Sequence, residues 1–501
     1  MVMITLAGVA FAVFAFLFFH KFEGLRSNDE AHYSQLARNL SSGHGFTTKA
    51  ITPIDLAIDP RVDDHPDYWR APLYPLILGI AYLFMGPKEY GGVLVSGLFF
   101  ILLAPMLYLF GRRLSERAIG ISAAAIALAL PQMWDYSLHA LTEMSFAFLL
   151  VCLLYSIYAR ANPFVTGLVF GLCYLNRYNA LFYVPVIIWF FAVVDKYTWR
   201  RMGMFAAGAF VVSAPWLIRN TALTGNPLFS LQNYMPAMFT TTYPGYTVYA
   251  SFDPISVAAT LRDHPWDVLS KYARGLNYLT GEIPSLTHPV IMLLFVGGAL
   301  ALHAPRRKRF LQYAFFIMMI IQLHLVALAV SPVEPLIRHF VPFIPVIVIF
   351  AVFAFEQLVR LVPRPRTQRF LTAAMVVVVI TTSVNKGRNI DCEPMHAVSE
   401  QEIEYIKRLG SGPVVTDQAW ELAWKADRAA IWAPAEYSGF RERLSAIRYV
   451  FFSGTPFEPS ESTSYRREYL ENPDFNRAFV LEKRFDEGGM LFHRAGERGQ
   501  T

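Results

Sequence analysis

Long apolar stretches, separated by short polar ones, dominate the chain from Val2 to about residue 387. An α-helix needs roughly 17 to 25 mainly apolar residues to cross a bilayer. Stretches of about this kind occur at 2–20, 91–111, 118–136, 143–159, 163–176, 178–194, 202–218, 289–304, 310–330, 339–358 and 370–386. The pattern predicts a polytopic α-helical membrane protein with about 11 transmembrane helices.

The apolar segment 72–87 differs from these, because it has only about 16 residues and a proline at each end. Four loops are rich in lysine and arginine: 112–117, 196–201, 305–309 and 360–369. All four lie in the cytoplasm, as basic loops should, only if 72–87 does not cross the membrane. We therefore predict an interfacial helix pair in the first outer loop, with loops 21–90 and 219–288 outside the cytoplasm.

The chain changes to mixed polar sequence at about residue 388. EQEIEYIKRLG has helical spacing and ends in glycine, whereas GPVVTD, AIRYVFFSG and FNRAFVLEKRF have the composition of short strands. We predict a transmembrane domain at 1–387 and a small soluble α/β domain at 388–501, also outside the cytoplasm.

Composition agrees with the membrane class. The chain has 54% hydrophobic and 16% charged residues and a mean hydropathy of +0.35, which is too apolar for a soluble protein of 501 residues. Most of the net charge of +6 lies in the basic loops, so it is a topology signal and does not indicate nucleic-acid binding. The three cysteines form no disulfide framework.

Four arginines occur at the predicted outer ends of spans, opposite the basic loops: Arg70, Arg177, Arg219 and Arg338. Arginine offers a planar fork of donors that suits phosphate, and its charge persists at ordinary pH. The group predicts a bound phosphate at the outer surface. The alternative is that each arginine extends to lipid phosphates or pairs locally.

Acidic residues lie on the same side. Asp29 and Glu30 follow the first span, and Glu143 begins another, one turn after His139. A carboxylate there can serve as a general base, although it can also simply favour the start of a helix. A third possibility is a divalent cation such as Mg²⁺ or Mn²⁺ held by Asp29 and Glu143, with His32 and His139 extending the site toward zinc.

Aromatic residues are frequent in both outer loops. Tyr33 and Tyr74 in the first loop and Tyr243 in the stretch 232–252, together with His32 and His139, are candidates for a sugar or lipid groove. An interfacial aromatic belt is the alternative for these rings.

The motifs resemble the GT-C superfamily of membrane glycosyltransferases over roughly the first 390 residues. The first loop contains DEAHYSQLARNL, a G-x-GF sequence, YWRAPLYPL and a G-P-x-E turn. LTE, LNRYNALFYVP, PWLIRNTALTGNPLF and RHFVPFIP follow in the expected order. The most similar branch contains bacterial proteins like the protein O-mannosyltransferases and the lipid A aminoarabinose transferase.

This resemblance implies a polyprenyl-phosphate-linked sugar donor and inverting transfer to a hydroxyl on the outer membrane face. Asp29 matches the catalytic acidic residue of the family, Glu143 its second acidic position, and Arg70 the basic residue at the donor phosphate. The aminoarabinose branch has an acidic-basic pair before a double proline. Here Trp69-Arg70 precedes Ala71-Pro72, so the resemblance does not identify the sugar.

The expected protein is therefore a hexosyl- or pentosyltransferase of the bacterial inner membrane, with its active site and C-terminal domain outside the cytoplasm. Expected partners are the lipid-linked donor, membrane lipids, and a lipid, glycan or protein acceptor. The sequence specifies no cofactor with certainty, and a divalent cation, Mg²⁺ or Mn²⁺, held by the carboxylates is the open alternative. A transporter or flippase for lipid-linked saccharides is the alternative, but it should carry charges near the middle of the membrane.

Overall fold

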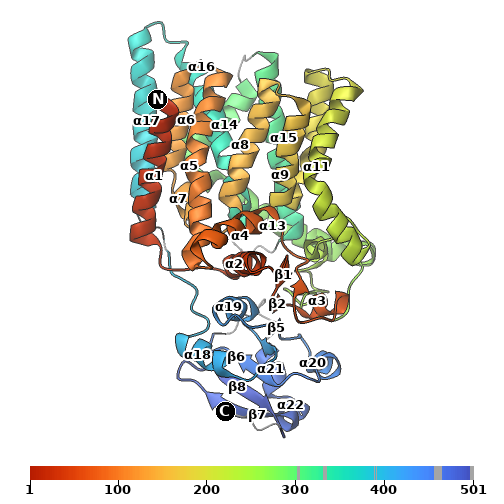
Figure 1. The fold of residues 1–501 in the computed structure, drawn as a ribbon. Helices are drawn as coiled ribbons and strands as arrows, with labels where there is room; N and C mark the ends of the chain where they lie inside the picture. The colour runs from red at the N-terminus through yellow and green to blue at the C-terminus, as the bar shows by residue number, and fades with distance from the viewer. Residues whose placement is uncertain (302–304, 331–335, 389, 391, 456–464, 497–501) are drawn as a thin grey trace.

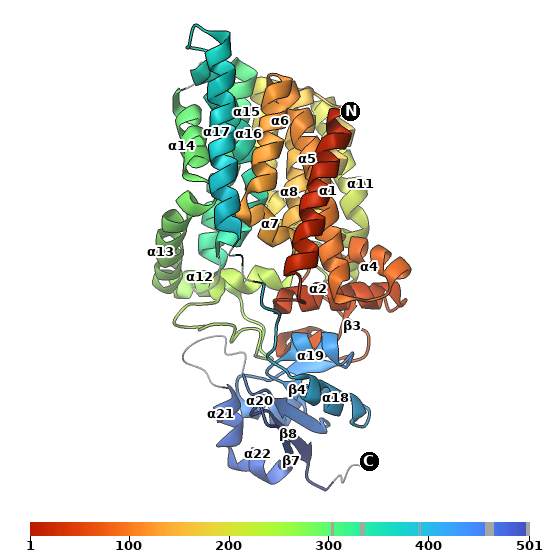
Figure 2. The ribbon, with the colours of Figure 1, turned by 90° about the vertical axis from the view of Figure 1, so that its left-hand side faces the viewer.

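A computed structural model describes residues 1–301, 305–330, 336–388, 390, 392–455 and 465–496. A bundle of long helices forms one part of the molecule, and a smaller α/β domain forms the other (Figure 1). Two connecting segments with short helices, 22–88 and 225–288, lie largely between them (Figures 1 and 2). We call the end of the bundle that faces the α/β domain its domain end.

The bundle contains a helix at each predicted span. These are α1 (Val2–Lys21), α5 (Glu89–Leu114), α6 (Arg117–Ala129), α7 (Pro131–Ser137), α8 (Glu143–Ala159), α9 (Pro163–Asn176), η1 (Tyr178–Tyr183), α10 (Val184–Trp189), η2 (Phe190–Val194), α11 (Trp199–Thr224), α14 (Pro289–Ala301), α15 (Arg306–Ala329), η5 (Leu336–Phe343), α16 (Ile344–Val359) and α17 (Pro365–Gly387). Residues 302–304 of the predicted span 289–304 lie outside the described residues.

Length and apolar composition confirm the polytopic helical class. Among the described residues, six helices are long and apolar enough to cross a membrane, or up to eight if each of two bent pairs is one span. The helices 143–159, 163–176 and 178–194 are apolar but shorter. The count of about 11 spans therefore stays a prediction.

The predicted span 118–136 is not one continuous helix. α6 and α7 meet at an angle of 65°, and Pro131 begins α7. Proline has no backbone N–H and its ring clashes with the carbonyl four residues earlier, so it breaks a helix at this point.

α9 and α11 pack closely through two glycines. A Cβ atom on Gly167 would lie 2.1 Å from the carbonyl oxygen of Phe205, and one on Gly208 would lie 2.1 Å from that of Phe164. Small residues allow helix backbones to approach in this way where lipid supplies no hydrophobic drive for helix association.

The four basic loops lie at the end of the bundle away from the α/β domain, which we call the basic end (Figure 1). Asp195, directly before loop 196–201, forms ion pairs with Arg307 and with Arg160 Nε, the latter at 3.5 Å. Ser115 Oγ donates to Glu356 Oε2 at 3.1 Å, and Glu356 also pairs with Arg360. Contacts therefore link the basic loops into two groups at the same end of the bundle.

The first connecting segment contains α2 (Asn28–Ser41), β1 (Thr47–Thr48), β2 (Ala50–Ile51), α3 (Pro53–Ile58), β3 (His65–Pro66) and α4 (Leu73–Met85). α4 lies beside α2 at the domain end (Figure 2). Both ends of α4 adjoin the α/β domain, because Trp69 contacts Trp420 at 6.4 Å and Tyr82 stacks on Trp424 at 6.5 Å between ring centroids. The segment 72–87 thus begins and ends on one side of the bundle.

The second connecting segment contains η3 (Leu231–Ala237), α12 (Val257–Asp263), α13 (Pro265–Glu282) and η4 (Ile283–Ser285). The tail contains α18 (Glu400–Arg408), β4 (Val414–Thr416), α19 (Ala419–Lys425), β5 (Ala430–Trp432), α20 (Tyr437–Arg443), β6 (Tyr449–Phe452), α21 (Tyr465–Leu470), α22 (Pro473–Ala478), β7 (Phe479–Arg484) and β8 (Met490–Arg494). α18 begins with a capping box formed by Ser399 and Glu402.

The tail strands form most of a six-stranded sheet in the order β2-β5-β4-β6-β8-β7. β2, β5, β4 and β6 run parallel to one another, whereas β8 is antiparallel to both β6 and β7. β2 belongs to the first connecting segment, and Ala50 and Ile51 pair with Ala430 and Ile431. The sheet therefore joins residues of both predicted domains, and it anchors the tail to the first segment.

The two ends of the bundle should differ in accessibility. With the native cysteines replaced by alanine, the exposed variants His44→Cys and Ser438→Cys should react with a membrane-impermeant maleimide in intact spheroplasts. The exposed variants Arg113→Cys and Arg306→Cys should react only after lysis. If Arg113→Cys reacted in intact spheroplasts and His44→Cys did not, the predicted orientation would be wrong.

Candidate functional site

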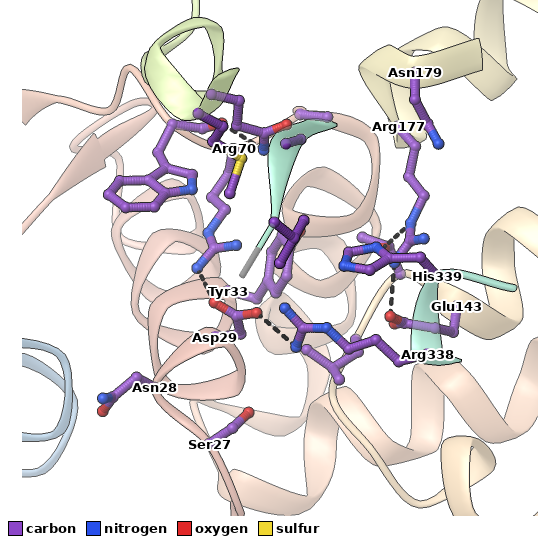
Figure 3. A pocket seen from close by; sticks show the side chains of 18 of the residues that line it. Ser27, Asn28, Asp29, Tyr33, Arg70, Glu143, Arg177, Asn179, Arg338 and His339 are labelled. Carbon is purple, nitrogen blue, oxygen red and sulfur yellow. Dashed lines mark hydrogen bonds and ion pairs between the residues drawn. The ribbon is translucent and has the colours of Figure 1, made fainter. Parts of the chain in front are cut away.

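A cavity of about 660 Å³ lies at the domain end of the bundle. Its walls come from the start of α2, from the segment before α4, from the starts of α8 and η1, and from η3, α15 and η5. The tail contributes residues as well. Of the sequence candidates, Asp29, Tyr33, Arg70, Glu143, Arg177 and Arg338 line this cavity. Figure 3 shows these six side chains converging.

Asp29 lies between two arginines (Figure 3). Arg338 Nη1 approaches Asp29 Oδ2 at 3.0 Å, and Arg70 Nη2 donates to Asp29 Oδ1. Ser27 caps α2 by accepting from the Glu30 N–H, and this cap places Asp29 in the first helical turn. Burial raises the pKa of the Asp29 carboxyl, but the charges of Arg70 and Arg338 outweigh burial and hold it well below its usual range.

Arg70 is held by residues behind the cavity. Its Nε donates to His32 Nδ1 at 3.1 Å, and its guanidinium lies 4.8 Å from the centroid of the Tyr33 ring. His32 Nε2 in turn contacts Asp67 Oδ2 at 2.9 Å. His32 is buried and does not line the cavity, so it supports Arg70 and is not part of a groove.

The second carboxylate, Glu143, is paired on one oxygen only. Arg177 Nη2 donates to Glu143 Oε1 at 2.6 Å, and Arg177 Nε donates to Thr142 Oγ1 at 2.8 Å. Within the described part of the chain, the buried Oε2 of Glu143 has no hydrogen-bond partner. An unsatisfied carboxylate oxygen at a cavity is available to a hydroxyl group of a ligand.

These carboxylates are a poor fit for a divalent cation. Arginine guanidinium groups contact both Asp29 and Glu143, and they place positive charge where a cation would lie. The two histidines have other partners, since His32 contacts Asp67 and His139 contacts Glu30. In the described residues, no group of three or more His, Cys, Asp or Glu is arranged to hold a metal ion.

Residues 64–218 match a family model described as dolichyl-phosphate-mannose-protein mannosyltransferase. The structure is similar to ArnT from Cupriavidus metallidurans bound to undecaprenyl phosphate, with a TM-score of 0.60 and 13% identity over 99% of this chain and 98% of that chain. The chain has the fold of the GT-C glycosyltransferases.

Two archaeal structures agree with this assignment. The apo oligosaccharyltransferase of Archaeoglobus fulgidus has a TM-score of 0.56 and 12% identity, over 90% of this chain and 69% of that chain. The AglB oligosaccharyltransferase from the same organism, in complex with an inhibitory peptide and a dolichol-phosphate, has a TM-score of 0.55 and 12% identity over the same shares. No curated protein sequence matches the chain.

Glu30 and His139 do not line the cavity of this GT-C fold. Glu30 is fully buried, accepts from the Ala140 N–H at 3.0 Å and contacts His139 Nδ1 at 2.6 Å. His139 Nε2 lies 3.5 Å from Asp135 Oδ1. These contacts fasten α2 to the turn before α8, so we correct the catalytic expectation for Glu30 and the groove expectation for His139 to a structural role.

Three further candidates also lie outside the cavity. Arg219 Nη2 donates to the carbonyl of Asp67 at 2.8 Å, and its guanidinium lies 4.5 Å from the Trp216 ring centroid, so it anchors the first segment to α11. The Tyr74 hydroxyl donates to the carbonyl of Gly92 at 2.9 Å, inside the packing of α4 on α5. Tyr243 is not among the lining residues, whereas the nearby Tyr246 is.

Several lining residues were missed by sequence reasoning. His339 follows Arg338 directly, and its Nε2 is buried without a hydrogen-bond partner among the described residues. Its position beside a recognised arginine was a usable signal. Gln418 and Thr455 come from the tail, and no motif there marked them.

The Glu30–His139 pair predicts a pH-dependent stability. Burial lowers the pKa of His139, but the carboxylates of Glu30 and Asp135 outweigh it and raise that pKa to about 9. Because the folded pKa is raised, the stabilisation is complete below the unfolded pKa of roughly 6.5 and is lost as pH rises to about 9, on the order of 3 kcal/mol. Thermal unfolding of purified protein should therefore shift to lower temperature across this range.

Glu30→Gln keeps the acceptor for the Ala140 N–H but removes the charge, so its melting temperature should depend less on pH and be lower at pH 6. The exposed Glu442→Gln serves as the matched control and should follow the unmodified protein. Equal slopes for Glu30→Gln and the unmodified protein would contradict the assignment.

Proposed function

We propose that the protein is a glycosyltransferase that moves a sugar from a polyprenyl-phosphate-linked donor to a hydroxyl group of an envelope acceptor. The observation that carries this proposal is the convergence of Asp29 and Glu143 with three arginines in one cavity at the domain end. The family match to residues 64–218 and the likeness to ArnT with undecaprenyl phosphate support it.

The donor phosphate competes with Asp29 for Arg70 and Arg338. A phosphate, like a carboxylate, offers a pair of oxygens that a guanidinium group can bind, so the two arginines that now hold Asp29 are already positioned for it. While they remain on Asp29, its depressed pKa makes it a weak base. When the two arginines bind the phosphate and release Asp29, the Asp29 carboxylate is no longer stabilised by their charges, and it becomes a stronger base.

The reaction then needs one proton acceptor and one stabilised leaving group. The acceptor oxygen forms a bond to the anomeric carbon and gives its proton to Asp29, while the bond from that carbon to the phosphate oxygen breaks. The electron pair stays on the polyprenyl phosphate, which gains one negative charge that Arg70 and Arg338 stabilise. Attack opposite the leaving group inverts the anomeric centre.

Glu143 serves the acceptor in this scheme. Its Oε2 accepts a hydrogen bond from the incoming hydroxyl, while Arg177 keeps Oε1 in place. The cavity lies at the domain end, opposite the basic loops, which agrees with a site on the outer face of a bacterial inner membrane. A lipid, a glycan or a protein carries the acceptor hydroxyl, and the transferred sugar is a hexose or a pentose.

Asp29→Asn should lower product formation roughly 10²- to 10⁴-fold, because the amide cannot accept the proton. The readout is mass spectrometry of envelope glycoconjugates from cells that lack the native protein and express the variant. Glu143→Gln should have a smaller effect, since it still accepts a hydrogen bond. The assignment of Asp29 as the base would be wrong if a folded Asp29→Asn protein formed near-normal amounts of product. It would also be wrong if Glu143→Gln lost more product formation than Asp29→Asn.

Arg70→Ala should weaken binding of undecaprenyl phosphate roughly tenfold to hundredfold, as expected for the loss of a charge-assisted contact. Calorimetry on the purified protein measures this affinity. Arg61→Ala is the matched control, because Arg61 is an exposed arginine of the same segment that pairs with Asp59. Unchanged affinity in Arg70→Ala would leave Arg70 with a structural role only.

A further inference from the structure

The tail contributes directly to the cavity. Gln418 lies just after β4 and Thr455 just after β6, and both line the cavity. β4 and β6 are neighbouring parallel strands, so the two residues stand at the same carboxyl edge of the sheet. In open α/β sheets this edge is where ligands bind, and here it faces the cavity.

Hydrogen bonds tie the two loops at this edge together. Gln418 Nε2 donates to the carbonyl of Thr455 at 2.8 Å. The buried Asp417 accepts from the Ser453 N–H at 3.0 Å and from Ser453 Oγ at 3.1 Å. In the described part of the chain Gln418 Oε1 accepts no hydrogen bond. The edge therefore presents a fixed amide whose oxygen is available to a ligand.

The same part of the cavity has aromatic rings. Trp69 and Tyr246 line it. Trp69 contacts Trp420 at 6.4 Å, Trp420 contacts Trp432 at 5.2 Å, and Tyr246 contacts Trp432 at 6.2 Å between ring centroids. This cluster joins both connecting segments to the tail.

A second amide lies next to this cluster. Gln232, which also lines the cavity, donates from Nε2 to the carbonyl of Trp69 at 3.2 Å. These side chains are aromatic or uncharged, and they adjoin the arginines around Asp29, because the Arg70 guanidinium lies 5.6 Å from the Trp69 ring centroid.

We propose that Trp69, Tyr246, Gln232, Gln418 and Thr455 form an acceptor subsite for a carbohydrate. A ring face packs against the C–H face of a sugar, while amides donate to and accept from its hydroxyl groups. None of these five side chains carries a charge, and the Arg70 guanidinium lies 5.6 Å from the Trp69 ring centroid, so the surface suits an uncharged sugar placed beside the arginines that bind the donor phosphate. This inference rests on the proposed function and names the acceptor class, a sugar hydroxyl of a glycolipid or glycan.

The test uses the full-length protein in nanodiscs and saturation-transfer difference NMR. The probes are methyl glycosides of glucose, galactose and mannose, and, separately, short serine- and threonine-containing peptides. At least one glycoside should bind, with the strongest saturation on its ring C–H protons. Gln418→Ala should weaken that binding roughly two- to tenfold, the usual effect of losing a neutral hydrogen bond.

Gln401→Ala is the matched control, because Gln401 is an exposed glutamine of α18 in the same tail. Thr455→Ala removes only an exposed side chain, so it reports on the subsite even if Gln418→Ala fails to fold. The inference is overturned if no glycoside binds, if only the peptides bind, or if glycoside binding is the same in the folded Gln418 and Thr455 variants as in the control.

Binding of undecaprenyl phosphate separates this inference from the proposed function. The Gln418→Ala and Thr455→Ala proteins should bind this lipid as the unmodified protein does. If the unmodified protein binds glycosides but not undecaprenyl phosphate, the proposed donor fails while the carbohydrate subsite stands. If it binds undecaprenyl phosphate but no glycoside, the subsite alone fails.

Discussion

The ion pairs of Asp29 with Arg70 and Arg338 are the contact on which the cavity depends. Asp29 lies in the first turn of α2, Arg70 precedes α4, and Arg338 lies in η5 before α16, so one carboxylate joins three distant parts of the chain. Partly buried charges of this kind are costly to leave unpaired, so removing one partner destabilises the fold by leaving the charges of the others uncompensated. The same pairing keeps two arginines in position before any phosphate arrives.

Residues that never touch the cavity hold this arrangement in place. His32 and Asp67 orient Arg70, Arg219 fixes the carbonyl of Asp67, and the Glu30–His139 pair fastens α2 to the start of α8. Charged groups at the domain end of the bundle therefore divide into two sets. One set faces the cavity, and the other holds in place the segments that form the cavity walls.

The tail completes the cavity as well as covering it. β2 adds a strand from the first connecting segment to the tail sheet, and the tryptophan cluster packs the sheet against both segments. These contacts bring the carboxyl ends of β4 and β6 to the cavity mouth. A cationic region from the bundle and first segment thus meets a neutral, aromatic region that includes the tail, which suits a reaction between a charged donor and an uncharged acceptor.

The sequence by itself determined the helical membrane class and the grouping of basic loops, because apolar length and local charge are properties of short segments. It also identified Asp29, Arg70, Glu143, Arg177 and Arg338 as candidates. The local pattern alone did not separate Arg338 from Arg219, or Asp29 from Glu30, and only the resemblance to the GT-C superfamily singled out Asp29. Each pair has the same local signal, and adjacent helical residues point about 100° apart. Which of them faces the cavity depended on how α2, η5 and α11 pack. The part played by β2, Gln418 and Thr455 likewise depended on contacts between segments hundreds of residues apart, which only the tertiary structure decided.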